Sequence, residues 1–385
     1  MSQPCLTTTT QLASRLIRLD TTNPPGNESR ATTLIAERLG DSGLEPTVQT
    51  WEEGRANLVC TLPGADPGAP ALLLSGHLDT VGLGAQPWSV DPFGGIVDGD
   101  RLYGRGATDM KGGVAAMVVA FERLAASWHH ASPARSVVLA LTASEESGCQ
   151  GAQAILPLLP TIGAIVVGEA TANHVGVGHK GVMWARLRVD GRTAHASRPD
   201  LGDNAVVRMA ELISALEATT PAAGECILGR PTVTPTLIAG GSVRNMVPDL
   251  CECTLDIRLT TAFGAAAARR VLDHLTAPVP TCHAEIDLVV PPVLTSEQDP
   301  WLSTVIELIG SPDLRTAAYF TDASVLAPAL GDPPVCILGP GEPALAHQVD
   351  EWCSVQAIDD CVDIYQSIAE RWCGAVESTT SETKP

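Results

Sequence analysis

Short, mostly apolar runs recur along this chain, and segments with helical spacing stand between them. Runs that are apolar on both faces are typical of strands in a parallel sheet that helices cover on both sides. The sequence therefore predicts an α/β fold with a mainly parallel sheet. The strand candidates are ANLVCTL (56–62), ALLLSG (71–76), SVVLALTA (136–143), AIVVG (164–168) and VCILGPG (335–341), and the main helix candidates are GGVAAMVVAFERLAASW (112–128), GAQAILPLL (151–159), WLSTVIELIG (301–310) and VQAIDDCVDIYQSIAERW (355–372).

The pattern changes from about residue 175 onward. CECTLDIRL (251–259) alternates strictly between apolar and polar residues, which indicates a half-exposed, antiparallel strand. Helical patterns flank it at 204–218 and 262–275. We expect residues 175–290 to form an inserted α+β domain of one sheet and two helices, and residues 1–174 and 291–385 to form the other domain. The segment VESTTSETKP (376–385) is expected to be a disordered tail.

Charge and cysteine usage exclude several classes of protein. Lys and Arg number 24 against 44 Asp and Glu, so the net charge of -20 would repel nucleic acid. The N-terminal residues lack the pattern of a signal peptide, and no uncharged apolar run reaches about 18 residues. The eleven cysteines are scattered and form no CxxC pair, which is typical of reduced thiols. We expect a cytoplasmic protein that binds neither membranes nor nucleic acid.

Histidines and carboxylates follow the predicted strands. In open α/β sheets, ligands bind beyond the carboxyl ends of the strands, so these side chains are expected to converge. Another carboxylate, Asp109, lies on the Gly-rich loop GRGATDMKGG. The residues at strand ends are His77 and Asp79, Glu145 and Glu146, Glu169, and His347.

This donor set contains imidazoles and carboxylates but no thiolate. Such a set is typical of a hydrolytic site for zinc, cobalt or manganese rather than a structural zinc site. If five of these seven residues are ligands, they suffice for two ions only when one carboxylate bridges both. Each feature alone has an ordinary structural interpretation: His77 as a surface loop residue, the Glu145–Glu146 pair as a solvated helix start, and Glu169 as a helix cap. Their joint occurrence at strand ends favours the metal site.

Seven motifs occur in an order that resembles a known enzyme family. They are SGHLDTV, GRGATDMKGG, ASEESGCQGA, GEAT, GRTAHASRPDLGDNAV, GGSVRNMVPD and AHQVDE. The chain resembles the dizinc amidohydrolases and peptidases that include acetylornithine deacetylase, succinyl-diaminopimelate desuccinylase, aminoacylase and carboxypeptidase G. The resemblance extends from TTNPPGNE (21–28) to the last predicted helix. It implies a zinc-peptidase-like catalytic domain with an inserted lid or dimerisation domain.

The resemblance also implies roles for individual residues. Asp109 would bridge two divalent metal ions, with zinc favoured over cobalt or manganese. Asp79 would accept the second imidazole N–H of the first histidine ligand. Glu145 would be the general base for a hydroxide bridging the two metals. The remaining ligands would be His77 and Glu169 for one ion, and Glu146 and His347 for the other.

His195 lies in the TAHAS segment, where a histidine is more often a turn residue than a catalytic one. In the family, a histidine of this motif reaches across a dimer interface to stabilise the oxyanion in the neighbouring active site. The resemblance thus implies a homodimer built through the inserted domain.

Three further residues are candidates for substrate binding. Arg258 lies on the polar face of the alternating strand, where the alternative is an ordinary ion pair with Asp256 or Glu252. In related enzymes an Arg on this strand grips a substrate carboxylate together with an Asn, here Asn245. Gly341, in the Gly339–Pro340–Gly341 turn, either lines the pocket or forms a simple connection.

We therefore predict a metal-dependent amidohydrolase that cleaves the amide bond of an N-acyl amino acid. A dipeptidase or carboxypeptidase would use the same metal centre with a different pocket, so short peptides remain alternative substrates. A serine hydrolase is disfavoured because the sequence contains no G-x-S-x-G elbow.

Overall fold

The chain divides into two compact units, each described here by itself. The computed structural model describes residues 6–128, 133–219, 226–310 and 313–374. The first unit comprises residues 1–177, 295–315 and 321–385, and the second comprises residues 178–294 and 316–320. The tail expected at 376–385 lies outside the described residues.

A mixed sheet runs in the order β1-β2-β6-β3-β7-β15-β8-β13, with β14 pairing to β8, and its strands from β1 to β15 in this order belong to the first unit. Its four central strands, β6, β3, β7 and β15, run parallel to one another. The strands on either side of this centre are antiparallel to their neighbours. The bounds are β1 Thr47–Glu52, β2 Arg55–Leu62, β3 Ala71–His77, β6 Val137–Thr142, β7 Ile162–Val167, β8 Gly176–His179, β13 Val293–Leu294, β14 Arg315–Ala317 and β15 Val335–Ile337.

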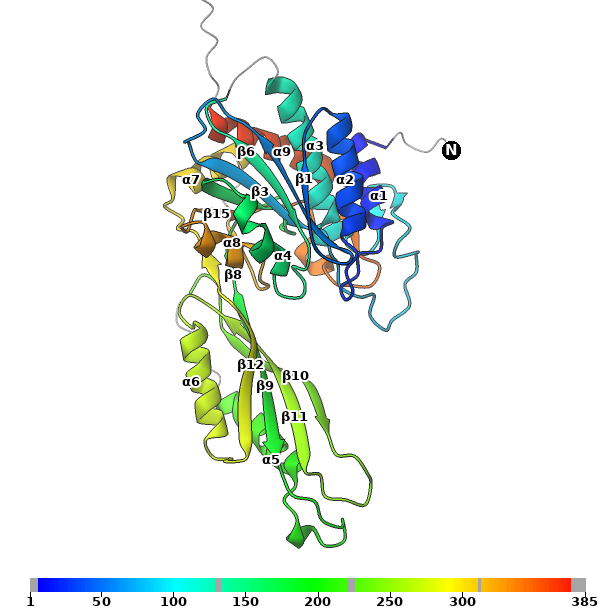
Figure 1. The fold of residues 1–385 in the computed structure, drawn as a ribbon, viewed down its shortest axis with the longest axis vertical. Coiled ribbons are helices and arrows are strands. Elements are labelled where there is room, and N and C mark those ends of the chain that lie inside the picture. The colour runs from blue at the N-terminus through cyan, green and yellow to red at the C-terminus, as the bar shows by residue number, and fades with distance from the viewer. Residues whose placement is uncertain (1–5, 129–132, 220–225, 311–312, 375–385) are drawn as a thin grey trace, which may run out of the picture. The chain divides into compact units, whose positions relative to one another are not determined.

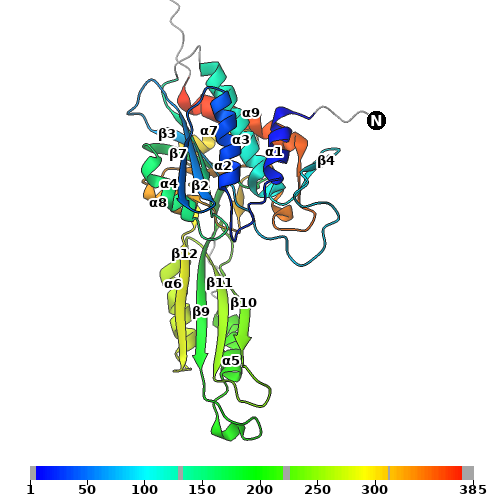
Figure 2. The same ribbon diagram turned by 45° about the vertical axis from the view of Figure 1, so that its right-hand side comes forward.

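Helices cover both faces of this sheet (Figures 1 and 2). Every second residue of β2, β3, β6 and β7 packs into one apolar core with α1 (Thr8–Ile17), α2 (Ser29–Asp41), α3 (Gly112–Trp128) and α9 (Val355–Cys373). On the other face α4 (Gln150–Ile155) packs on β2 and β6, and α8 (Ala323–Ala329) packs on β7. Because both faces are covered, the central strands are buried along their whole length.

The predicted strands and helices of the first unit are confirmed, although two are shorter than predicted: the α-helix expected at 151–159 ends at Ile155, and the strand expected at 335–341 ends at Ile337. The helix predicted at 112–128 is α3, and those predicted at 301–310 and 355–372 are α7 (Pro300–Ile309) and α9. One strand differs in direction: β2 is mostly apolar, but it runs antiparallel to both β1 and β6. Its apolar character reflects burial, which does not encode strand direction. Smaller elements are η2 (Leu156–Leu158) and a sheet of β4 (Ile96–Asp98), β5 (Arg101–Tyr103) and β16 (Trp352–Ser354).

The second unit is a four-stranded antiparallel sheet with two helices on one face. Its strand order is β10-β11-β9-β12, with β9 Gly181–Asp190, β10 Thr232–Gly240, β11 Leu250–Leu259 and β12 Cys282–Val290. The buried residues of β11 alternate with partly exposed ones, as the sequence predicts, and they pack against α5 (Ala205–Thr219) and α6 (Ala265–Thr276). A short turn, η3 (Pro199–Leu201), precedes α5.

The second unit covers residues 178–294 and 316–320, where the sequence predicts an inserted domain at 175–290. Residues 316–320 belong to the second unit because Lys180 N–H donates to the Ala317 carbonyl and the ring of Phe320 packs edge-on against Trp184. Within the described part of the chain, no helix has the length and apolar character needed to cross a membrane. Every described cysteine is a free thiol.

Candidate metal centre

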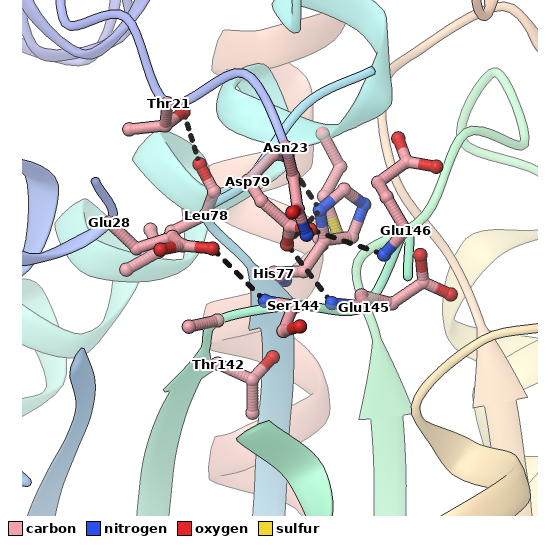
Figure 3. A network of polar contacts seen from close by, with 12 residues as sticks. Thr21, Asn23, Glu28, His77, Leu78, Asp79, Thr142, Ser144, Glu145 and Glu146 are labelled. Carbon is pink, nitrogen blue, oxygen red and sulfur yellow. Dashed lines mark hydrogen bonds and ion pairs between the residues drawn. The ribbon is translucent and has the colours of Figure 1, made fainter. Parts of the chain in front are cut away.

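The four parallel strands at the centre of the sheet end at one common edge, and polar side chains follow each of them. His77 is the last residue of β3, and Glu169 follows β7 by two residues. Glu145 and Glu146 follow β6, on the turn that leads to α4 (Figure 3). His347 follows β15 after the short turn η4 (Pro343–Leu345). The parallel topology therefore brings together residues that are far apart in the sequence.

Two sets of metal-donor atoms converge at this edge and share Asp109. His77, Asp109 and Glu169 form one set, and Asp109, Glu146 and His347 form the other. His77 Nε2 lies 3.0 Å from Asp109 Oδ1 and 3.6 Å from Glu169 Oε1. His347 Nε2 lies 3.2 Å from Asp109 Oδ2 and 3.2 Å from Glu146 Oε1. The two carboxylate oxygens of Asp109 thus face two different histidines, as a bridging carboxylate requires.

The loop that carries Asp109 is held by a buried ion pair. Asp109 lies in the kinked π-helical turn η1 (Ala107–Lys111), where its φ and ψ are not helical. The carboxylate of Glu351 accepts hydrogen bonds from the backbone N–H groups of Gly106, Thr108 and Asp109. It also accepts from Arg105 Nη1 at 2.6 Å, and both side chains are almost fully buried. Glu351 therefore fixes the backbone on either side of the shared ligand.

Asp79 is buried next to His77 and contacts the following turn as well. Its carboxylate accepts the backbone N–H groups of Glu145 at 3.1 Å and Glu146 at 3.2 Å. His77 Nδ1 lies 3.5 Å from Asp79 Oδ1, but it is closer, at 3.0 Å, to the backbone carbonyl oxygen of Asp79. The sequence predicts that Asp79 contacts only the imidazole of His77. In the structure Asp79 also orders the turn that carries Glu145 and Glu146.

The site concentrates negative charge in a buried place. Burial raises the pKa of Glu169 well above its usual range, and the charge of Asp109 raises it further. The same two causes raise the pKa of Glu146. Burial lowers the pKa of His347, but hydrogen bonds to Asp109 and Glu146 outweigh burial and raise it to about 10. The neighbouring carboxylates thus favour the protonated form of the His347 imidazole.

The donor chemistry fits two divalent cations. All donors are carboxylate oxygens or imidazole nitrogens, a combination suited to zinc, cobalt or manganese. Cations at these donors would displace the imidazole protons and neutralise the same carboxylates, so metal binding and deprotonation are coupled. Each set supplies three protein donors, which leaves coordination positions for water or substrate.

Glu145 belongs to neither of these two sets, but it forms a third possible donor group with His77 and Glu146. One of its carboxylate oxygens lies within 4.8 Å of donor atoms of His77 and Glu146. The side chain is buried, and burial raises its pKa well above the usual range, with Glu146 and Glu169 adding to the rise and His77 opposing it. A carboxyl group with a raised pKa can accept and release protons near neutral pH.

The remaining predicted site residues fall into two places. Gly341 lies in the first unit, close to the metal donors: a Cβ placed on it would lie 2.3 Å from the Thr108 carbonyl oxygen and 3.0 Å from Ala170 Cβ. His195, Asn245 and Arg258 lie in the second unit.

Within the second unit, His195 and Asn245 are neighbours. His195 forms an isolated β-bridge with Met246, and the Ala196 N–H donates to the Asn245 carbonyl at 2.9 Å. The His195 ring is exposed, and its Nδ1 lies 2.8 Å from the Ser197 hydroxyl. Arg258 donates to both carboxylate oxygens of Asp256, at 2.7 and 3.1 Å, which is the ordinary ion pair considered from sequence.

Several residues that order the site were not identified from the sequence as site residues. Glu351 ends the AHQVDE motif, and Arg105 lies in GRGATDMKGG, so the motifs themselves were the available signal. Three others, Asn23, Glu28 and Arg55, lie far from the site in sequence. Asn23 and Glu28 lie in TTNPPGNE, the segment where the resemblance to the family begins.

Known proteins resemble this chain over most of its length. The family model described as "Peptidase family M20/M25/M40" matches residues 73–371. A probable succinyl-diaminopimelate desuccinylase of Staphylococcus aureus is 27% identical over 89% of this chain and 94% of its own length. An acetylornithine deacetylase of Aliivibrio fischeri is 28% identical over 88% of this chain and 90% of its own length.

Solved structures share the fold. An M20 family metallo-carboxypeptidase from Sulfolobus solfataricus matches with a TM-score of 0.79 and 16% identity, covering 95% of this chain and 99% of that one. A dinuclear metal binding peptidase of the M20 family from Bacillus subtilis matches with a TM-score of 0.69 and 16% identity, covering 95% and 97%. The family motifs, the shared fold and the match over residues 73–371 lead to one conclusion: the chain belongs to peptidase family M20/M25/M40.

Proposed function

We propose that this protein removes the acyl group from an N-acylated amino acid by hydrolysing its amide bond. As a member of its family the chain is a metal-dependent hydrolase of amide bonds. The observation that supports the proposed site most directly is Asp109, whose two carboxylate oxygens face His77 and His347 at 3.0 and 3.2 Å.

Five residues would hold two cations. The resemblance to the dizinc enzymes favours zinc, and cobalt or manganese are alternatives because the same imidazole and carboxylate donors suit them. His77 and Glu169 would hold one, Glu146 and His347 the other, and Asp109 would bind both. When bound, two such cations would polarise the scissile carbonyl group and lower the pKa of a water molecule toward about 7.

Glu145 would move the proton. It would accept a proton from the attacking water and deliver it to the nitrogen of the departing amine. Its buried position and raised pKa support this role, because a base is most effective when its pKa lies near the working pH. Asp79 would act through other residues, since its carboxylate holds the backbone of Glu145 and Glu146 and lies beside His77.

The proposed substrate class draws on the sequence relatives. The two at 27% and 28% identity are named for removing a succinyl and an acetyl group. In this proposal Arg258 and Asn245 bind the substrate carboxylate, and the turn at Gly341 lines the pocket. Arg258 donates through Nε and Nη2 to Asp256 and through Nη1 to the Ala318 carbonyl at 3.5 Å, so the second N–H of Nη1 would be the donor for a carboxylate.

The second unit would then act as a lid and dimerisation domain. His195 is exposed, which suits a residue that completes the oxyanion site of a partner subunit in a homodimer. We place the enzyme in the cytoplasm, where buried free thiols such as Cys336 and Cys361 stay reduced.

A substrate panel with metal control tests the proposal. The metal-free protein, reloaded with zinc or cobalt, is assayed on N-acetyl, N-succinyl and N-formyl amino acids and on dipeptides. We expect up to two cations per chain, hydrolysis of one N-acyl class, and loss of activity on chelation. Full activity in a metal-free preparation would refute the metal-based mechanism. Hydrolysis of dipeptides alone would replace the deacylase with a dipeptidase.

A further inference from the structure

The turn after β6 has an unusual set of backbone partners. Four consecutive backbone N–H groups, from Ala143 to Glu146, all donate to side-chain oxygens, which belong to three residues far from the turn in sequence. The acceptors of the last three are the carboxylates of Glu28 and Asp79 (Figure 3). Asn57 accepts the first, at 2.9 Å. Side chains, rather than the sheet, therefore fix this turn.

Ser144, in the middle of the turn, adopts a backbone conformation that a residue with a side chain rarely takes. Its φ is +68°, in the left-handed region. Its hydroxyl lies 2.7 Å from the Ser147 hydroxyl, and its N–H donates to Glu28 Oε1 at 3.2 Å. Because Glu145 follows directly, the direction of the base depends on Ser144 keeping this conformation.

Glu28 belongs to a buried cluster from the N-terminal part of the chain. Arg55 joins it to Asn23: Nη1 donates to Glu28 at 2.9 Å and Nη2 donates to the Asn23 side-chain oxygen at 2.7 Å. Asn23 in turn donates to Asp79 Oδ2 at 2.8 Å and to the Ser147 hydroxyl at 2.9 Å. The cluster thus reaches the turn both directly, through Glu28, and indirectly, through Asp79.

The cluster fits closely against its own loop. A Cβ placed on Gly26, whose φ is +106°, would lie 2.6 Å from Glu28 Oε2 and 2.8 Å from the Arg55 guanidinium. Only glycine leaves room for the pair at this point. None of Asn23, Glu28 and Arg55 belongs to a donor set among the described residues.

We propose that Asn23, Glu28 and Arg55 are positioning residues that hold the Ser144–Glu146 backbone so that Glu145 and Glu146 present their carboxylates to the metal centre. The proposal rests on the proposed function, in which Glu145 is the base and Glu146 a ligand. Losing the acceptor for Ser144 N–H lets Ser144 leave the left-handed conformation. Both carboxylates then move, but the His77–Asp109–Glu169 set does not.

The first test compares Glu28→Ala with the conservative Glu28→Gln, whose amide oxygen can still accept the N–H of Ser144. Asn23→Ala is a second variant, which removes the contacts of Asn23 with Asp79 and Arg55 without removing a buried charge. Glu122→Ala is the control, because it removes a partly buried ion pair with Arg38 in the same unit, away from the turn. Turnover, KM, the unfolding midpoint and Co²⁺ binding are measured for each.

For Glu28→Ala we expect a loss in kcat of about ten- to a hundredfold, because a shift of about 1 Å in a catalytic group can have that effect. KM should change little, and the second equivalent of Co²⁺ should bind more weakly while the first is retained. Glu28→Gln should recover most of both properties, Asn23→Ala should resemble Glu28→Ala in weaker form, and Glu122→Ala should match the wild type. A folded Glu28→Ala protein with normal kcat and normal Co²⁺ binding would overturn the proposal.

A second test separates positioning from general stability. In the Glu28→Ala background, Ser144→Gly should recover kcat by about fivefold or more, because glycine adopts a left-handed φ without the cost imposed by a Cβ. Ser144→Ala also removes the hydroxyl but keeps the Cβ, so it should recover nothing. Equal effects of the two substitutions would refute the argument. If the wild type hydrolyses none of the N-acyl substrates, the proposed function fails, whereas Co²⁺ binding by the variants still decides the positioning role.

Discussion

Two ion pairs in this protein have the same N–O distance, but one is buried and the other is exposed to solvent. Arg105 Nη1 lies 2.6 Å from Glu351, with both side chains buried. Arg123 Nη1 lies 2.6 Å from Asp363, with side-chain exposures of 48% and 74%. If burial rather than distance sets the energetic weight of an ion pair, removing Glu351 should be far more damaging than removing Asp363.

The expected magnitudes follow from the partners that each change leaves behind. Glu351→Ala leaves the Arg105 guanidinium buried without its carboxylate, at a cost of about 3–5 kcal/mol. It also removes the acceptor for the N–H groups of Gly106, Thr108 and Asp109. Asp363→Ala removes an exposed pair, which contributes about 0–1 kcal/mol. A domain is stable by about 5–15 kcal/mol, so only the first change threatens folding.

Tryptophan fluorescence during urea unfolding is a suitable assay, because six of the seven tryptophans lie in the first unit and only Trp184 lies in the second. A Trp184→Phe background makes the signal specific for the first unit. Metal content is measured in parallel, since Glu351 also fixes the backbone of Asp109. Glu351→Gln, which keeps one acceptor oxygen, should fall between the wild type and Glu351→Ala.

Similar losses of stability in Glu351→Ala and Asp363→Ala would refute the reasoning. So would a Glu351→Ala protein that keeps both cations at wild-type affinity, because the shared ligand would then not depend on this anchor.

Three further predictions concern the proposed catalytic residues and the pH dependence of stability. Glu145→Gln should keep both cations and lose at least about a hundredfold in turnover, whereas Glu146→Gln should weaken one cation in metal titration; metal loss in both variants would contradict the assignment. His195→Ala should lose turnover but keep its metals, and mixing it with Glu145→Gln should restore activity through subunit exchange; no recovery despite proven exchange would exclude action in trans. Burial lowers the pKa of His179 from 6.5 to about 4, so the unfolded chain binds a proton below pH 6.5 that the folded chain does not, and stability to urea should fall between pH 6.5 and 4. A His179→Gln variant with the same pH slope as the wild type would contradict this origin.

The sequence predicts those parts of the fold that depend on local pattern. The apolar runs that become β3, β6 and β7 and the helix at 112–128 are confirmed because burial on both faces and helical spacing leave a direct trace in the residues. The alternation in β11 likewise predicts its half-exposed sheet. The direction of β2 left no such trace, since antiparallel strands can be as apolar as parallel ones when both faces are covered.

The candidate metal donors could be identified because each follows a strand or lies in a motif. The structure brings His77, Asp109, Glu146, Glu169 and His347 together at one edge, while their proposed roles await the experiments above. The contacts that order them could not be identified in this way, although Arg105 and Glu351 themselves lie in motifs. The contact between Arg105 and Glu351, and that between Glu28 and Ser144, join segments that only the completed tertiary structure brings together, and neither leaves a periodic pattern.

The order of strands in the first sheet has a consequence for synthesis of the chain. β15 lies between β7 and β8, yet it leaves the ribosome after the whole second unit, and His347 follows it. A nascent chain therefore carries β7 with one unpaired, apolar edge while more than a hundred further residues are added at about 5–20 residues per second. Unpaired apolar edges invite wrong pairing, so slower growth at low temperature or co-expressed chaperones should raise the soluble yield. The candidate metal centre cannot be complete before His347 has been added, after the whole second unit.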